Sequence, residues 1–233
     1  MNQNADAREL ARFDSVAARW WDSDGPFRPL HELNPQRLAF ISERQSLPGA
    51  HIVDIGCGGG ILSEAMAGAG AEVIGLDLAA DALDVARLHA LEVGIRVDYR
   101  LQSVEQLASE MPESQDAVTC LEMLEHVPDP LSVLRACVQL LKPGGRLFLS
   151  TLNRTPKAFA LGIVGAEYVL GLLPRGTHRY ERFLKPSELR RALVDLGLVE
   201  LEFEGLAYDP FTRQARRNAD LSINYLVAAQ RPW

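Results

Sequence analysis

The sequence predicts an α/β fold with a doubly wound, mostly parallel sheet of seven strands. Three observations predict it. Short apolar runs alternate with helical patterns along the chain, and the first apolar run ends in a glycine cluster that opens a helix. The last two apolar runs follow each other without a helix between them. We therefore expect an antiparallel hairpin at one edge of the sheet.

The expected elements alternate along the chain. The first strand is the apolar run from His51 to Asp54. Gly94 and the stretch from Lys142 to Gly145 carry the residue types that stop a helix. Further strands are expected at 72–77, 96–101, 115–121, 146–151, 199–205 and 222–230, and helices at 61–69, 80–93, 131–141 and from 187 to 196, the last capped by Lys185-Pro-Ser187.

Composition excludes several classes of protein. The 233 residues, 47% hydrophobic and 24% charged, suit one globular domain, 1–233. The net charge of −7 disfavours a nucleic-acid partner. Three cysteines are too few for a disulfide framework and predict reduced thiols in a cytosolic protein. The first residues, MNQNADARELARF, lack the apolar region of a secretory signal, and no stretch is long and apolar enough to span a membrane.

The glycine cluster DIGCGGG, residues 54–60, lets a ligand approach the backbone closely. Asp77 ends the second strand, where a carboxylate can accept hydrogen bonds from both ribose hydroxyls of an adenosine. Ile61 stands where the dinucleotide fingerprint needs its third glycine, which disfavours a nucleotide-linked oxidoreductase. Asp54 can either brace the turn or contact a cationic part of a ligand, and these alternatives stay open.

Two sets of motifs carry a family resemblance. VDIGCGGG, the acid in VIGLD and LLKPGGRLFLS resemble the class I S-adenosylmethionine-dependent methyltransferases, which implies a Rossmann-like sheet. WWD, PLHELNPQR, ARLHALEVGI, CLEMLEHVPDP, STLNRTPKAF and INYLVAAQ extend the resemblance over nearly the whole chain, to the ubiquinone-biosynthesis O-methyltransferases. That resemblance implies methyl transfer to phenolic hydroxyls of polyprenylated precursors, namely 2-polyprenyl-6-hydroxyphenol and 3-demethylubiquinol.

The resemblance also implies a donor site for S-adenosylmethionine. Its contacts are expected from Arg37, Gly56, Asp77 and Leu121, where family members can carry methionine at the last position. Arg37 can clamp the methionyl carboxylate with a bidentate fork. Without the resemblance, a surface ion pair would be the favoured interpretation of Arg37.

Methylation of a phenol needs a base or a metal, because the free hydroxyl has a pKa of about 10. Glu122, Glu125 and His126 follow the fourth expected strand, and a helical turn there would place them on one face. Three alternatives stay open. The three residues can bind Mg²⁺ or another divalent cation; His126, together with Glu125, can act as a metal-free catalytic base; or the glutamates can cap the backbone.

Two segments outside the sheet have expected roles. Residues 1–49, with Trp20 and Trp21, form a helical cover over the cofactor, although both tryptophans could be core; His31 is expected to be structural. The insertion 153–183 contains an apolar segment between basic residues, which predicts a lid on an anionic membrane surface, with a helix buried against the sheet as the alternative. The implied location is cytoplasmic, at the inner face of the cytoplasmic membrane, with possible association with other ubiquinone-biosynthesis proteins.

Alternatives to the implied activity are a methyltransferase of another small catechol-like acceptor and a non-catalytic, cofactor-binding membrane scaffold. The polar cluster after the fourth expected strand argues against the scaffold, which has no use for such groups at the end of the sheet.

Overall fold

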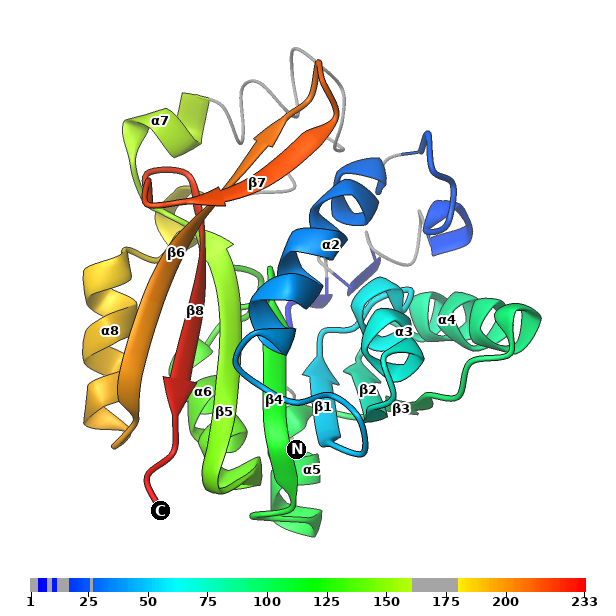
Figure 1. Ribbon diagram of the computed structural model, residues 1–233, viewed down its shortest axis with the longest axis horizontal. Coiled ribbons are helices and arrows are strands. Elements are labelled where there is room, and N and C mark those ends of the chain that lie inside the picture. Colours follow the sequence, from blue (N-terminus) through cyan, green and yellow to red (C-terminus); the bar gives the residue numbers. More distant parts are fainter. Residues whose placement is uncertain (1–3, 8–9, 12–16, 26, 161–179) are drawn as a thin grey trace.

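The structure is a computed structural model that describes residues 4–7, 10–11, 17–25, 27–160 and 180–233 (Figure 1). Its sheet has eight strands in the order β3-β2-β1-β4-β5-β8-β6-β7. The five strands from β3 to β5 pair in parallel, and β8, β6 and β7 continue the sheet antiparallel. The strands are β1 His51–Ile55, β2 Glu72–Asp77, β3 Asp98–Leu101, β4 Gln115–Leu121, β5 Leu141–Leu152, β6 Val199–Asp209, β7 Gln214–Asn218 and β8 Asn224–Gln230.

Helices cover both faces of the sheet, as the doubly wound prediction requires. In Figure 1, α2 crosses in front of β4 and α6 lies behind β5. One apolar cluster joins the sheet to α5, α6 and α8, and a second joins the opposite face to α2 and α3. The helices are η1 Ala17–Arg19, α2 Arg28–Ser42, α3 Ile61–Gly68, α4 Ala80–Val93, α5 Val104–Glu110, α6 Pro130–Leu140, α7 Pro156–Ala158, η3 Tyr180–Arg182 and α8 Pro186–Asp195.

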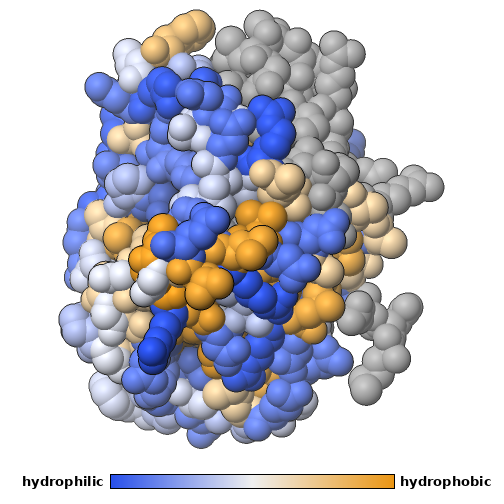
Figure 2. Space-filling model, turned by 90° about the vertical axis from the view of Figure 1, so that its right-hand side faces the viewer, coloured by the Kyte–Doolittle hydropathy of each residue, from blue (hydrophilic) through white to orange (hydrophobic). Residues whose placement is uncertain are grey.

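The α4 side of the molecule carries an apolar patch among hydrophilic residues (Figure 2). Exposed large apolar side chains in this part of the chain are Leu88, Leu91 and Val93. The inward side of α4 is formed by Leu83 and by alanines that pack against Cys57 and Tyr99. The exposed leucines are therefore outside the core.

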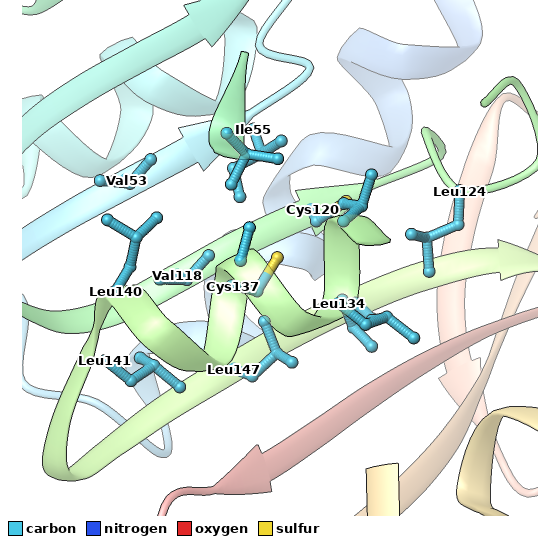
Figure 3. Close-up of a cluster of buried hydrophobic side chains, with 14 of the residues drawn as sticks. Val53, Ile55, Val118, Cys120, Leu124, Leu134, Cys137, Leu140, Leu141 and Leu147 are labelled. Carbon is cyan, nitrogen blue, oxygen red and sulfur yellow. The ribbon is translucent and has the colours of Figure 1, made fainter. Parts of the chain in front are cut away.

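Buried apolar side chains of α6 pack against β1, β4 and β5 (Figure 3). Leu134, Cys137 and Leu140 of α6 meet Val118 and Leu147 of the sheet, and all five are 2% exposed or less. The start of α6 is set locally, because the Asp129 carboxylate accepts a hydrogen bond from the Ser132 N–H at 3.1 Å. This face is an apolar core that joins α6 to β4 and β5.

The structure has one strand more than the seven predicted. The additional strand is β7, whose sequence QARRN has no apolar alternation because it lies at the edge of the sheet. An antiparallel hairpin does stand at that edge, but it consists of β6 and β7. The last apolar run, β8, lies between β5 and β6 instead. Helix α5 was also not expected; Ser103 and Gln106 start it with a capping box.

The topology brings distant parts of the chain to one end of the sheet. Strands β1, β2, β4 and β5 all end there, and this is where ligands bind in open α/β sheets. Because β8 runs antiparallel, its first residue, Asn224, lies at the same end, opposite Leu152 of β5. None of the described helices is long and apolar enough to cross a membrane.

Candidate functional site

The glycine loop after β1 has a backbone that few other residues could adopt. Gly56, Gly58 and Gly60 have φ angles of 70°, 53° and 90°. A Cβ atom added to Gly58 would lie 2.2 Å from the Trp20 ring. Gly58 is therefore packed beneath the Trp20 ring, whereas the backbone at Gly56 is exposed.

Asp77, the predicted ribose ligand, holds this loop in place. One carboxylate oxygen accepts a hydrogen bond from the Gly58 N–H at 2.8 Å. The other oxygen accepts from the N–H groups of Leu78 and Ala79, at 2.7 and 2.9 Å. The acid thus ties the end of β2 to the loop, and its ribose contact stays a prediction.

Asp54 is buried at the end of β1. Its carboxylate accepts hydrogen bonds from the Ser63 and Thr119 hydroxyls, at 2.6 and 2.7 Å. Burial raises its pKa to about 6, although both hydroxyls and the Arg37 charge act to lower it. Asp54 thus joins the end of β1 to α3 and β4 through side-chain hydroxyls, and its contact with a ligand stays a prediction.

Arg37 is a buried cation and not a surface ion pair. It extends from α2 and is 6% exposed. Its Nη2 lies 3.2 Å from Glu122 Oε1. Within the part of the chain that the structure describes, its buried Nε and Nη2 atoms have no hydrogen-bond partner. A buried guanidinium with unused donors fits a ligand carboxylate, which could accept a bidentate pair.

Glu122 occupies an unusual turn directly after β4. Its φ angle is 55°, a left-handed conformation that is unfavourable for a glutamate. Its N–H donates to the Ser150 carbonyl at 3.0 Å, and its Oε1 accepts from the Ser150 hydroxyl at 2.8 Å and from Asn224 Nδ2 at 2.9 Å. The carboxylate consequently faces Arg37.

Glu125 and His126 lie further along the same turn. Glu125 is 4% exposed, and its Oε2 accepts a hydrogen bond from the Thr151 hydroxyl at 2.8 Å. His126 is half-buried, and its N–H donates to the Met123 carbonyl at 3.0 Å. Arg182 donates to the His126 carbonyl oxygen at 3.3 Å. The structure therefore brings both candidate catalytic residues to the end of the sheet.

The structure does not assemble Glu122, Glu125 and His126 into one metal site. No group of three His, Cys, Asp or Glu side chains that could hold a metal ion occurs among the described residues. The prediction assumed a helical face, but the chain forms a turn there, and α6 begins only at Pro130. Glu122 points to Arg37 and Asn224, whereas Glu125 binds Thr151.

The N-terminal segment contacts the glycine loop, as a cover would. Trp21 Nε1 donates to the Gly59 carbonyl at 2.9 Å, and its ring stacks on His89 with 3.4 Å between the centroids. The His31 ring nitrogen Nε2 bonds to the Trp20 carbonyl at 2.9 Å, consistent with its expected structural role.

Other predicted and unpredicted residues complete the site. Leu121 is partly buried at the end of β4, against the apolar cluster on the α2 side. Sequence reasoning missed Ser150, Thr151 and Asn224 as site residues. In the sequence, these residues are marked only by their positions at the ends of expected strands. Those strand ends meet at one end of the sheet. Most of the predicted membrane lid, residues 161–179, lies outside the described residues.

Comparisons with known proteins agree with this geometry. Residues 27–202 match the family model of a methyltransferase domain. The ubiquinone biosynthesis O-methyltransferase of Xanthomonas campestris pv. campestris (strain B100) is 57% identical, over 99% of this chain and 97% of its own length. The protein of that name from Xanthomonas euvesicatoria pv. vesicatoria (strain 85-10) is 55% identical, over the full length of both chains.

A solved structure shares the fold at lower identity. Magnesium protoporphyrin IX methyltransferase from Synechocystis PCC 6803, with bound SAH, superposes with a TM-score of 0.70 at 22% identity, over 95% of this chain and 94% of that one. The fold is thus that of the S-adenosylmethionine-dependent methyltransferases. From the identity and coverage of its relatives, the chain belongs to the family of ubiquinone biosynthesis O-methyltransferases.

Proposed function

We propose that the protein transfers a methyl group from S-adenosylmethionine to the phenolic hydroxyls of polyprenylated ubiquinone precursors, 2-polyprenyl-6-hydroxyphenol and 3-demethylubiquinol. The observation that carries the proposal is the buried Arg37, whose unused donors lie at the end of the sheet where ligands bind. The names of the Xanthomonas relatives support the choice of pathway.

The donor would be held by residues of three elements. Arg37 of α2 would bind the methionyl carboxylate, and the backbone at Gly56 would approach the ligand. Asp77 would accept from the ribose hydroxyls, and Leu121 would supply an apolar wall. When bound, the donor supplies a methyl group that its positive sulfur already activates, so the protein mainly has to position the acceptor.

The acceptor must lose a proton to become a good nucleophile. We assign that proton to His126, a half-buried imidazole that follows the end of β4. His126 would take the proton of the acceptor hydroxyl, and that oxygen would then be the nucleophile toward the methyl group that a bound donor would supply. Glu125, held by Thr151, would orient the turn that carries the imidazole.

No metal step belongs to this mechanism, since the three candidate ligands do not fit one metal centre. The side chains of Glu122 and Glu125 accept hydrogen bonds from different partners, Asn224 and Thr151. A chelation experiment tests whether Mg²⁺ is an additional cofactor.

The test is mass-spectrometric detection of methyl transfer to short-chain analogues of both acceptors. We expect one added methyl group per acceptor, and His126→Gln to lower kcat by about 10²- to 10⁴-fold while binding of S-adenosylhomocysteine is unchanged. An unchanged kcat in His126→Gln would exclude His126 as the base. Turnover of only a different catechol would favour the alternative acceptor class, and no turnover of any phenol would favour a scaffold.

We also propose that the protein is cytoplasmic and binds the inner face of the cytoplasmic membrane peripherally. An acceptor with a polyprenyl tail resides in the bilayer, and the apolar segment 158–173 is too short and too charged to span it. Arg154, Lys157 and Arg182 are ion-paired with Glu188, Asp220 and Asp6, so the apolar residues would provide most of the affinity. Association with other ubiquinone-biosynthesis proteins would occur at the same membrane.

Sedimentation with liposomes that contain anionic lipid tests this location. The intact protein should sediment with the liposomes, and a variant that lacks residues 159–173 should not. Equal sedimentation of both proteins would contradict the membrane role of the segment.

A further inference from the structure

We infer that Asn224 is a positioning residue of the donor site, which acts through Glu122 on Arg37. The inference rests on the proposed binding of S-adenosylmethionine. It adds to that site a residue of β8, which is 102 residues from Glu122 along the chain.

Two hydrogen bonds and one ion pair converge on one oxygen atom. Oε1 of Glu122 accepts from Asn224 Nδ2 at 2.9 Å and from Ser150 Oγ at 2.8 Å, and it lies 3.2 Å from Arg37 Nη2. The orientation of the Asn224 amide follows from this contact, because a flipped amide would turn its oxygen toward the carboxylate. Asn224 is 8% exposed, so water competes little for the bond.

The ion pair between Arg37 and Glu122 needs this support. The two side chains are 7% and 21% exposed, and charges removed from water are costly unless they are paired and hydrogen-bonded. Glu122 also has a left-handed backbone, so its local conformation does not favour the observed position. Ser150 and Asn224 hold it from two neighbouring strands, β5 and β8.

The buried amide of Asn224 has a desolvation cost, which an apolar side chain used only for packing would avoid. Its Oδ1 atom is buried and has no hydrogen-bond partner in the described part of the chain. An apolar side chain at the start of β8 would leave no such atom, but it could not donate to Glu122. A neutral donor also supports Glu122 without adding a charge that would compete with Arg37 for its carboxylate.

Two ligands separate this role from a structural one. S-adenosylhomocysteine carries the amino-acid carboxylate that Arg37 would bind, whereas 5′-methylthioadenosine lacks it. We expect Asn224→Ala to weaken binding of S-adenosylhomocysteine about tenfold, as loss of a hydrogen bond to a charged group predicts. Binding of 5′-methylthioadenosine should change by less than about twofold. Calorimetry on the full chain gives both affinities.

A matched control is available in the same region. Asn153 is also 8% exposed, but its amide donates to the Leu221 carbonyl at 2.8 Å and not to Glu122. Asn153→Ala should lower the melting temperature without changing the ratio of the two affinities. Ser150→Ala removes a second bond to Glu122 Oε1 and should shift that ratio in the same direction as Asn224→Ala, which keeps the test decisive if the latter does not fold.

Asn224→Asp adds a pH-dependent readout. Two adjacent carboxylates repel each other unless they share a proton, so the variant should bind S-adenosylhomocysteine weakly at alkaline pH and recover relative to wild type as the pH falls. A structural defect would not recover in this way.

The outcomes are distinguishable. Equal loss of both ligands in Asn224→Ala, or loss of neither, would overturn the positioning role. If the wild-type protein binds S-adenosylhomocysteine but methylates no phenol, the proposed acceptor fails and the role of Asn224 is still measured. If the wild-type protein does not bind S-adenosylhomocysteine, the proposed donor fails, and the positioning role fails with it.

Discussion

Asp54, near the end of β1, is held by hydrogen bonds although its burial disfavours the charged form. Its carboxylate lies against Ser63 and Thr119, and its pKa is raised. The carboxyl group of Asp54 is therefore protonated more readily in the folded protein than in the unfolded chain. Folding and ionisation of Asp54 are therefore linked.

The free energy of unfolding should depend on pH through Asp54. Its pKa is about 6 in the folded protein and 3.8 in the ordinary state, so between these values the folded chain holds a proton that the unfolded chain has released. Stability from this group therefore falls as the pH rises through this window, by on the order of 3 kcal/mol. Asp54→Asn should remove that dependence.

Urea unfolding of wild type and Asp54→Asn between about pH 4 and pH 7 provides the measurement. The difference between the two free energies should shift in favour of the variant as the pH rises. Parallel pH profiles would show that Asp54 keeps an ordinary pKa.

Removal of metal ions tests whether Glu122 and Glu125 act through a bound cation. We expect EDTA-treated protein to keep its rate of methyl transfer, because Glu122 and Glu125 face different partners within the protein. The rate is measured before and after chelation, with Mg²⁺ or Zn²⁺ added back as the control. A loss of activity that added metal restores would show that the side chains rearrange into a metal site.

The turn after β4 was predicted less well than the strands and helices around it. The patterns at 61–69 and 80–93 predicted α3 and α4, because both helices have buried apolar residues and Gly94 ends the second one. A shared metal site of Glu122, Glu125 and His126 depended on a helical turn, which their spacing suits, but the chain forms a non-helical turn there. Its actual path depends on Ser150 and Asn224, which no local pattern reveals.

The N-terminal cover should support the bound donor through Trp21. Trp21 touches the glycine loop through one hydrogen bond and stacks on His89, which in turn bonds to the buried Glu64 at 2.8 Å. Trp21→Phe keeps an aromatic ring and removes the hydrogen bond. We expect the affinity for S-adenosylhomocysteine to fall about threefold to tenfold, with a small change in stability.

Calorimetry measures this affinity, and Trp233→Phe is the control, because Trp233 is 94% exposed and packs near Gly144, away from the loop. An affinity of Trp21→Phe equal to wild type would mean that the cover does not support the bound donor.

Contacts between distant segments hold the whole molecule together, and these are what the sequence could not predict. The β6–β7 hairpin binds α2 through a hydrogen bond from the Tyr208 hydroxyl to Glu32, 176 residues away. Burial and the Glu32 carboxylate raise the pKa of Tyr208 to about 12, so the hydroxyl donates at neutral pH. The strand order was predictable only in part, because nothing in its own sequence places β8 inside the sheet.

Removal of the Tyr208 hydroxyl should loosen this contact. Tyr208→Phe is expected to lower the free energy of unfolding by about 1.5–3 kcal/mol, the range for hydrogen bonds to charged groups. Urea unfolding gives the value. Phe211→Ala on the same hairpin is the control, since Phe211 is 85% exposed and should change stability by less than about 0.5 kcal/mol. Equal losses in the free energy of unfolding for the two variants would show that the Tyr208 hydroxyl makes no specific contribution through Glu32.

The place of β8 has a consequence for synthesis. A nascent chain that has emerged only as far as β7 contains the glycine loop, Asp77 and Arg37, but the edges of β5 and β6 that β8 will join are still open. Open edges are prone to pairing with other chains. The same strand supplies Asn224. One late event therefore closes the sheet and completes the support of Arg37, so an unfinished chain should neither be protected from aggregation nor capture the donor at full affinity.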